Sequence, residues 1–396
     1  MDLVTTKAIA GVDLLTSLPD GGELSCWLRR GEGIVGIGCA HSQTLDSAEE
    51  ADTWWSQILG STQIINDLED QPMAGPVAFI SFPFSAEGSY EIIVPKILIG
   101  SRKGQAWITS WNGASWDPQI LPNKPVPARA RRCTSPVAQD QWLAQVREAI
   151  TRIHDSHLAK VVLAREEILE MAPGFDRRWV MKHLGETYPQ TWTFCVKDLI
   201  GASPELLIRQ DRGLITSRVL AGTIHGDKDA TALAEALSSS SKDLAEHEYA
   251  VASVAQALDA HCTSLHVPEI PFVLQLPNVM HLASDITGAV RPGSTVVALA
   301  SAIHPSAAVC GTPTDQAREL IAELEDMDRG RYAGPIGWIN SHGDGEIALA
   351  LRCGLITNEH VHIYAGCGIL ADSDPMAEWE ETNAKLQPMK QALGAA

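Results

Sequence analysis

Strand-like and helix-like segments follow one another without regular alternation, and this order limits the fold more than any other feature of the sequence. Strands are predicted at residues 34–38, 77–82, 90–99 and 105–111, with one helical pattern, residues 47–66, among them. A doubly wound parallel sheet needs a helix between successive strands, so that fold class is disfavoured.

The second half of the chain mixes both kinds of element in the same way. A segment with three prolines and four basic residues, 121–132, is interpreted as a solvated connector near the end of the N-terminal region, residues 1–135; a short nucleic-acid patch is the alternative. Residues 136–396 form the second region. Strands are predicted at 158–165, 191–196, 205–209, 345–353 and 361–364. Helices are predicted at 138–154, 230–236, 241–263, 294–302, 314–326 and 377–387.

Composition narrows the class of protein and of partner. Thirty basic and 49 acidic residues give a formal net charge of -19, which argues against nucleic acid or an anionic membrane as the main partner. No apolar run reaches the length of roughly 20 residues that a membrane span needs. The first residues do not resemble a signal peptide, and the eight cysteines form no Cys-x-x-Cys pair. We therefore expect a cytoplasmic globular protein with reduced thiols.

A stretch near the C-terminus combines acidic and basic side chains at helical spacing. If Pro375 opens a helix, Glu378, Glu381 and Lys385 recur at i, i+3 and i+7 and share one face. Two carboxylates one turn apart can hold a hard divalent cation, and the ammonium group can hold an anion beside it. An exposed Glu/Lys face is the alternative interpretation.

Lys160 and Glu205 are the candidate catalytic pair. Lys160 lies in an apolar strand pattern, where a partly desolvated lysine can act as a general base. Glu205 follows Pro204 at the start of a strand, from which it could project into a cleft as an acid. An outward-pointing lysine and a surface carboxylate are the structural alternatives.

Three further segments carry residues suited to an anionic ligand or a metal. Asp243 and Glu246 repeat the i, i+3 acidic spacing near the start of another helix, although acids there also complement the helix dipole. The segments 221–223 and 365–368 are rich in small residues, so backbone N–H groups could approach a carboxylate; tight turns are the alternative. Arg352 could bind a carboxylate or a structural Asp.

Taken in order, these segments resemble the chorismate-utilising enzymes, and most closely the isochorismate synthases. The resemblance covers residues from about 136 to 390, whereas residues 1–135 match only loosely. The matching segments begin at Lys160, Ser203, Ala221, Lys242, His304, Arg331, Gly343, Tyr364 and Glu378. The family implies one α+β unit of large antiparallel sheets flanked by helices, like anthranilate synthase component I, with the active site in a central cleft.

The resemblance also implies roles for single residues and a Mg²⁺ cofactor. Lys160 would activate water for attack at C2 of chorismate, and Glu205 would protonate the departing C4 hydroxyl group. Glu246 and Glu381 would bind the metal directly, and Glu378 and Asp243 through water. The substrate-binding positions would be Ala221, Gly222, Thr223, His281, Ala308, Tyr332, Arg352, Ala365, Gly366 and Lys385.

Subfamily features favour isochorismate as the product. Anthranilate synthases resemble one another in a Gln at the position of Lys160, and aminodeoxychorismate synthases in a nucleophilic lysine at the position of Ala221. Water is therefore the expected nucleophile, and a monomer without a glutaminase subunit is expected. Salicylate synthases, which go on to eliminate pyruvate, are the main alternative; they often carry Thr where this chain has Ala308.

Two other classes of function are alternatives. A chorismate-binding regulatory protein would share the fold, but the matched catalytic positions here all carry competent residues. A glycoside hydrolase could use Glu205 and a C-terminal glutamate as its acid pair. That interpretation leaves Lys160 and the repeated acidic pairs unexplained, and it predicts activity without Mg²⁺.

Overall fold

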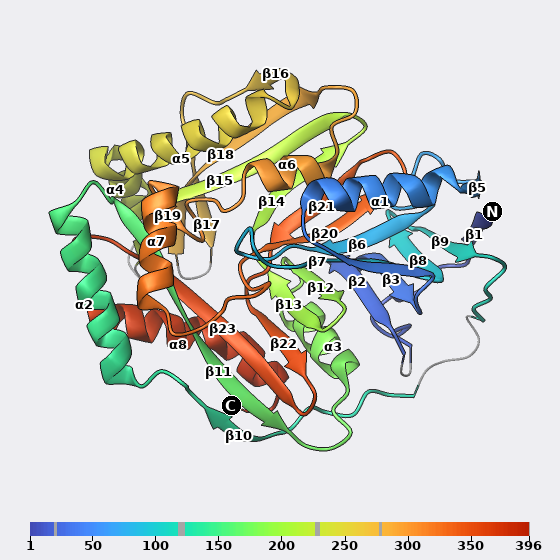
Figure 1. Ribbon diagram of the computed structural model, residues 1–396, viewed down its shortest axis with the longest axis horizontal. Helices are drawn as coiled ribbons and strands as arrows, with labels where there is room; N and C mark the ends of the chain where they lie inside the picture. Colours follow the sequence, from blue (N-terminus) through green and yellow to red (C-terminus); the bar gives the residue numbers. More distant parts are fainter. Residues whose placement is uncertain (20–21, 118–122, 226–229, 277–278, 396) are drawn as a thin grey trace.

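Two large β-sheets form the centre of the structure, and helices cover their outer faces (Figure 1). The computed structural model describes residues 1–396 except 20–21, 118–122, 226–229, 277–278 and 396. Among the described residues, strand pairs are antiparallel apart from the parallel pair β1/β5. The expected α+β class with large antiparallel sheets flanked by helices is confirmed.

The first sheet has 13 strands, and the short β19 (Gly311–Thr312) joins it by pairing with β11. In order across the sheet, the others are β10 (Ala130–Thr134), β11 (Lys160–Met171), β23 (His360–Ile369), β22 (Cys353–Thr357), β13 (Leu199–Ser203), β12 (Trp192–Val196), β2 (Leu24–Arg29), β3 (Glu32–Ile37), β8 (Ile97–Arg102), β9 (Gln105–Trp111), β1 (Asp2–Ile9) and β5 (Thr62–Asn66).

The second sheet has 10 strands, and β17 (Phe272–Leu276) joins it by pairing with β18. The others are, in order, β16 (Cys262–His266), β18 (Val279–Val290), β15 (Leu214–His225), β14 (Leu206–Asp211), β21 (Gly345–Leu349), β20 (Pro335–Asn340), β6 (Val77–Ser81), β7 (Tyr90–Val94) and β4 (His41–Leu45). Residues 1–135 thus contribute strands to both sheets.

Eight helices are described, and each lies against a sheet or another helix. On the first sheet, α8 lies along β23 between α2 and α3; on the second, α5 lies along β15 and β18, and α6 lies between α1 and β14. Their bounds are α1 (Ala48–Gly60), α2 (Gln139–Asp155), α3 (Arg177–Thr187), α4 (Ala230–Ser239), α5 (Ser241–Asp259), α6 (Val296–Ala302), α7 (Thr314–Leu324) and α8 (Pro375–Ala392).

Four predicted elements extend across the boundary between two observed elements, and the strand predicted over 345–353 is one of them. The helix predicted over 47–66 ends at Gly60, because residues 62–66 pair with β1 as strand β5. The helix predicted over 241–263 ends at Asp259, and Cys262 begins β16. The strand predicted over 90–99 is two strands, β7 and β8, in different sheets, and Pro95 lies between them because it cannot donate to a strand ladder.

Large aromatic side chains fill the core. Trp27, Trp107, Trp142 and Trp338 are fully buried, and the buried Trp55 donates its indole N–H to the carbonyl oxygen of Asn340, 3.0 Å away. These five tryptophans are therefore core residues. Within the described part of the chain, every helix is too short or too polar to cross a membrane.

Candidate active site

The candidate site lies where the chain passes from one sheet to the other. Ser203 ends β13 in the first sheet, and Glu205 precedes β14 in the second; in the opposite direction, β21 ends at Leu349 and β22 begins after Arg352. The strand predicted over 345–353 is therefore broken at this crossing. Arg352 takes a left-handed conformation there, with φ of 48°, which turns the chain between the sheets.

Hydrogen bonds join the two crossing segments. The hydroxyl group of Ser203 donates to the carbonyl oxygen of Leu349 at 2.6 Å, and the amide of Leu349 donates to the carbonyl oxygen of Glu205 at 3.1 Å. The amide of Ala202 donates to the carbonyl oxygen of Arg352 at 3.1 Å. Glu205 and Arg352 therefore project from one rigid junction.

Glu205 is the electrostatic centre of this junction. Burial raises the pKa of its carboxyl group, while the positive charges of Lys160, Arg352 and Lys385 act in the opposite direction. The surrounding protein thus favours the protonated acid, although the side chain is still partly accessible to solvent. A carboxyl group in such surroundings can deliver a proton to a leaving group.

Lys160 is the first residue of β11 and extends across the neighbouring strand β23. A Cβ atom built on Gly368 would lie 2.6 Å from Cε and 3.4 Å from Nζ of Lys160, so the lysine side chain occupies the space that a side chain at position 368 would need. Val162 pairs with Gly368 in the strand register, which sets Lys160 beside this glycine. The half-buried lysine therefore points along the sheet surface.

Helix α8 carries the acidic stretch and begins where the sequence predicts. Pro375 occupies its first turn, and the side chain of Asp374 caps it by accepting from the amide of Ala377 at 2.8 Å. Glu378, Glu381 and Lys385 are all half-buried, so they do not form a fully exposed face.

Lys385 connects α8 to strand β23. Its ammonium group donates to the carbonyl oxygen of Gly366 at 2.9 Å and forms an ion pair with Glu381 at 2.5 Å. Burial lowers the pKa of the Arg352 guanidinium group, and the nearby carboxylates of Glu205 and Glu381 act in the opposite direction. The structure therefore brings these two cations and two carboxylates together.

Tyr332 borders the same region. Its ring stacks on that of Tyr364, with centroids 5.0 Å apart, and its hydroxyl oxygen would lie 3.1 Å from a Cβ atom built on Gly366. A side chain at position 366 would therefore press on Tyr332 and on the backbone of β11. Ala365, the neighbouring position, is buried opposite Arg165 in the strand register.

A second group of candidate residues lies on the other sheet. Gly222 forms a bulge in β15 with φ of 74°, and a Cβ atom there would approach that of Asp243 to 3.1 Å. Ala221 is buried just before this bulge, and His281 on β18 pairs in register with Thr223. The side chains of Thr223 and Glu246 lie outside the described residues.

Sequence reasoning gave no role to His247, which fixes α5 above this bulge. The imidazole Nδ1 lies 3.1 Å from the carbonyl oxygen of Ala221, which can only accept, so Nδ1 carries the proton. Nε2 lies 2.8 Å from the hydroxyl oxygen of Ser284, at hydrogen-bond distance. His247 is nearly fully buried, and its position next to Glu246 in the helix was the available signal.

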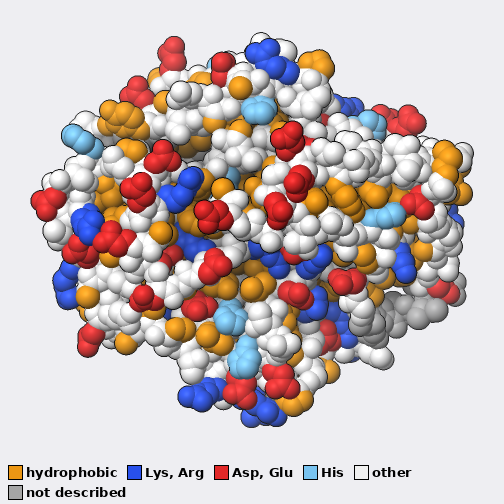
Figure 2. Space-filling view, viewed as in Figure 1, with side chains coloured by type: hydrophobic (Ala, Val, Ile, Leu, Met, Phe, Trp, Pro, Cys, Tyr) orange, Lys and Arg blue, Asp and Glu red, His pale blue; other side chains and the backbone are white. Residues whose placement is uncertain are grey.

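A cavity of about 200 Å³ extends from Glu205 along α5. Leu206 and Leu207 of β14, Val219 and Leu220 of β15, and Ala308 line it among others. Glu205 and Ala308 therefore border one space, and Leu220, which also lines it, lies two residues before the Gly222 bulge. Acidic side chains are spread over the face in Figure 2, with basic side chains among them near its middle.

The acids on α8 suit a hard cation. Burial raises the pKa of Glu378, and the charge of Glu381 raises it further, so a divalent ion beside both would relieve their repulsion. Glu378 also accepts from the hydroxyl group of Ser373 at 2.8 Å, which orients it. Over the described residues, no set of three or more His, Cys, Asp or Glu side chains is placed to hold a metal.

Comparison with known proteins shows which family this chain matches. The family described as chorismate binding enzyme matches residues 117–394. Isochorismate synthase MenF of Bacillus subtilis is 37% identical over 263 residues, which cover 65% of this chain and 56% of that protein. The matched segment thus spans little more than half of that relative's length.

Solved structures share the fold over nearly the whole chain. A 2,3-dihydroxybenzoate-specific isochorismate synthase, DhbC, from Bacillus anthracis has a TM-score of 0.76 at 29% identity, covering 96% of this chain and 97% of the other. The menaquinone-specific isochorismate synthase MenF from Escherichia coli has a TM-score of 0.83 at 24% identity, covering 99% and 95%. The second likeness concerns the fold alone.

Proposed function

Because this chain belongs to the chorismate-binding enzymes, we propose that it converts chorismate to isochorismate. The observation that carries the proposal is the environment of Glu205. Burial raises the pKa of its carboxyl group, and the positive charges of Lys160, Arg352 and Lys385 lie around it. An acid whose burial strengthens its hold on the proton, set among cations, suits the loss of a hydroxyl group from a dianionic substrate.

Two residues carry the chemical steps. Lys160 takes a proton from water as the water oxygen bonds to C2 of the ring. The two ring double bonds shift, and the bond between C4 and its hydroxyl oxygen breaks. Glu205 donates the proton that lets this oxygen leave as water. One water molecule enters at C2 as another leaves from C4. The same steps in reverse regenerate chorismate, so the reaction is reversible.

Basic groups bind the two carboxylates of the substrate. Arg352 supplies a planar fork for the pyruvyl carboxylate, with the hydroxyl group of Tyr332 beside it. Lys385 and the backbone at Gly366 lie nearby on α8 and β23. These local cations counter the net charge of -19, which would otherwise repel an anionic substrate.

The metal in this proposal is Mg²⁺. Glu246 and Glu381 would bind it, and Glu378 and Asp243 would act through water, in keeping with an ion that takes few carboxylates and retains water. When bound, it supplies positive charge that neutralises the substrate's ring carboxylate. Ala221 and His281 would line the ring, and Ala308 would border it.

Water as the nucleophile means that no ammonia-supplying partner is needed. The proposal is tested by running the reaction in ¹⁸O-labelled water and measuring the mass of isochorismate early in turnover. Attack by water at C2 predicts a product heavier by the isotope difference. An unlabelled product would contradict the roles of Lys160 and Glu205.

A further inference from the structure

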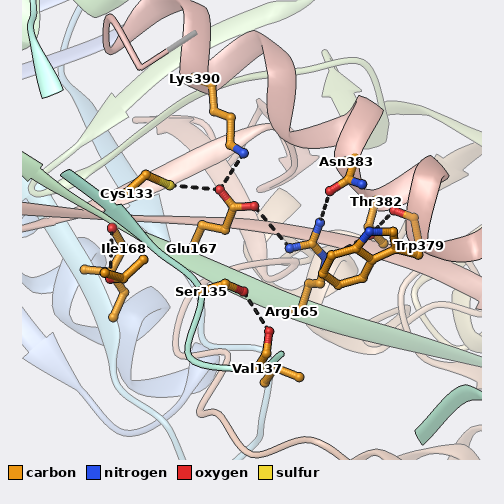
Figure 3. A network of polar contacts seen from close by, with 11 residues as sticks. Cys133, Ser135, Val137, Arg165, Glu167, Ile168, Trp379, Thr382, Asn383 and Lys390 are labelled. Carbon is orange, nitrogen blue, oxygen red and sulfur yellow. Dashed lines mark hydrogen bonds and ion pairs between the residues drawn. The ribbon is translucent and has the colours of Figure 1, made fainter. Parts of the chain in front are cut away.

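A buried arginine connects strand β11 to helix α8. Arg165 lies five positions after Lys160 on β11, and its side chain is completely shielded from solvent. Its guanidinium group contacts two elements at once, β11 itself and α8 (Figure 3). The mechanism above assigns it no role.

Three contacts hold the guanidinium group against α8. Its Nε donates to the hydroxyl oxygen of Thr382 at 2.9 Å, and one terminal nitrogen donates to the side-chain oxygen of Asn383 at 2.5 Å. Its central carbon lies 4.0 Å from the ring centroid of Trp379, which places the cation over the indole face. A planar fork can satisfy these contacts simultaneously.

The other side of the network returns to β11 and the end of α8. A terminal nitrogen of Arg165 lies 3.2 Å from a carboxylate oxygen of Glu167, and the second oxygen of Glu167 lies 2.6 Å from Nζ of Lys390. The thiol of Cys133 on β10 also donates to Glu167, at 3.1 Å. Three elements therefore meet at one charged cluster.

The α8 residues that contact Arg165 alternate along the helix with those of the candidate site. Thr382 and Asn383 lie between Glu381 and Lys385, and Trp379 follows Glu378 directly. Rotation or sliding of α8 that displaces the acids must therefore also break contacts to Arg165. Because Arg165 and Lys160 share one strand, the same contacts set the distance from Lys160 to the acids.

We propose that Arg165 is a positioning residue that fixes α8 on β11, so that Glu378, Glu381 and Lys385 face the metal and substrate at a set distance from Lys160. This inference rests on the proposed function for its metal and substrate. Burying charges costs desolvation energy, and apolar side chains of similar volume often stabilise as well or better. The network is therefore better explained by the geometry it fixes than by stability.

The test replaces Arg165 by Met, which keeps much of the volume and removes the fork. Mutation of a residue that orients metal ligands typically lowers metal affinity or activity by about 10–100-fold. We expect Arg165→Met to raise the Mg²⁺ concentration for half-maximal turnover by about tenfold or more. Hydrogen exchange of amides in residues 375–392, measured without metal, should become faster.

Two further substitutions grade the effect. Asn383→Ala removes one acceptor and should shift the Mg²⁺ requirement in the same direction by a smaller factor. It also carries the test if Arg165→Met does not fold. Arg165→Lys keeps the charge near Glu167 but cannot bridge Thr382 and Asn383 together, so its Mg²⁺ requirement should lie between those of the wild type and Arg165→Met.

The matched control is Arg178→Met. Arg178 is also a buried arginine, and it donates to Asp176 at the start of α3 and to the carbonyl oxygen of Asn123. Arg178→Met should lower the melting temperature and leave the Mg²⁺ requirement unchanged. A purely structural role for Arg165 predicts the same behaviour for both methionine variants.

The outcomes separate the two proposals. Wild-type Mg²⁺ dependence and wild-type exchange in α8 for both Arg165→Met and Asn383→Ala would overturn the positioning role. If the wild type does not turn over chorismate, the proposed function fails. Hydrogen exchange in α8 then still decides whether Arg165 fixes the helix.

Discussion

Replacing Glu205 by Gln tests the proton donor with the least disturbance of structure. The amide has nearly the same volume as the carboxyl group and can keep a hydrogen bond, but it has no acidic proton to give. Lys160, Arg352 and Lys385, the three cations around this position, remain in place.

The expected loss is kinetic. General acid catalysis contributes about 10²–10⁴-fold, or roughly 3–5 kcal/mol of the activation barrier, so kcat should fall within that range. KM for chorismate should change only a few-fold, because Arg352 and Lys385 still bind its carboxylates. Initial rates followed by chromatographic separation of chorismate and isochorismate measure both constants.

The melting temperature, unlike kcat, should not fall. Burial raises the pKa of Glu205, so the folded state holds this proton more tightly than the unfolded chain does. For such an acid, the stabilising contribution is present below the unfolded pKa and is lost as pH rises through the folded pKa. At neutral pH, Glu205→Gln should therefore melt no lower than the wild type.

Two results would refute this reasoning. A Glu205→Gln enzyme with kcat close to that of the wild type would remove Glu205 as the proton donor. A large fall in melting temperature at neutral pH would show that the ionised carboxylate stabilises the fold, contrary to the effect of burial on its pKa.

Three further predictions concern other parts of the structure. Gly368→Ala places a methyl group against Lys160 and should lower kcat with little change in KM, as steady-state rates would show. Arg352→Lys keeps the charge but loses the fork; KM should rise by about 10-fold or more, corresponding to one lost charged hydrogen bond, and an unchanged KM would contradict its role. Burial raises the pKa of Asp52 to about 6, against the hydrogen bond from Thr295. Wild-type stability should therefore fall as pH rises through this range. The free energy of unfolding of Asp52→Asn, relative to that of the wild type, should therefore rise by up to about 3 kcal/mol from about pH 4 to about pH 8, as measured by thermal melts.

Local signals predicted the elements whose limits are set by nearby residues. Helix α8 begins at Pro375 and carries Glu378, Glu381 and Lys385 together, because the proline and the helical spacing act within a few turns. The order of elements also excluded a doubly wound sheet. Both inferences need no knowledge of distant contacts.

Features that depend on pairing between distant segments could not be predicted from the sequence. Residues 62–66 leave the predicted helix because β1, far away in the chain, offers a pairing partner. The break in the strand predicted over 345–353 follows from the crossing between sheets, where Arg352 turns the chain. The contacts of Arg165 with α8 likewise join positions 217 and 218 residues apart.

The most direct measurement of the central claim is the identification of products from chorismate. Purified protein is incubated with chorismate and Mg²⁺, and a parallel sample contains EDTA. The account predicts isochorismate as the product, with turnover lost in EDTA. Salicylate with equimolar pyruvate would instead identify the lyase alternative and show that Ala308 does not mark the product. No turnover with Mg²⁺ present, or full activity in EDTA, would contradict the account.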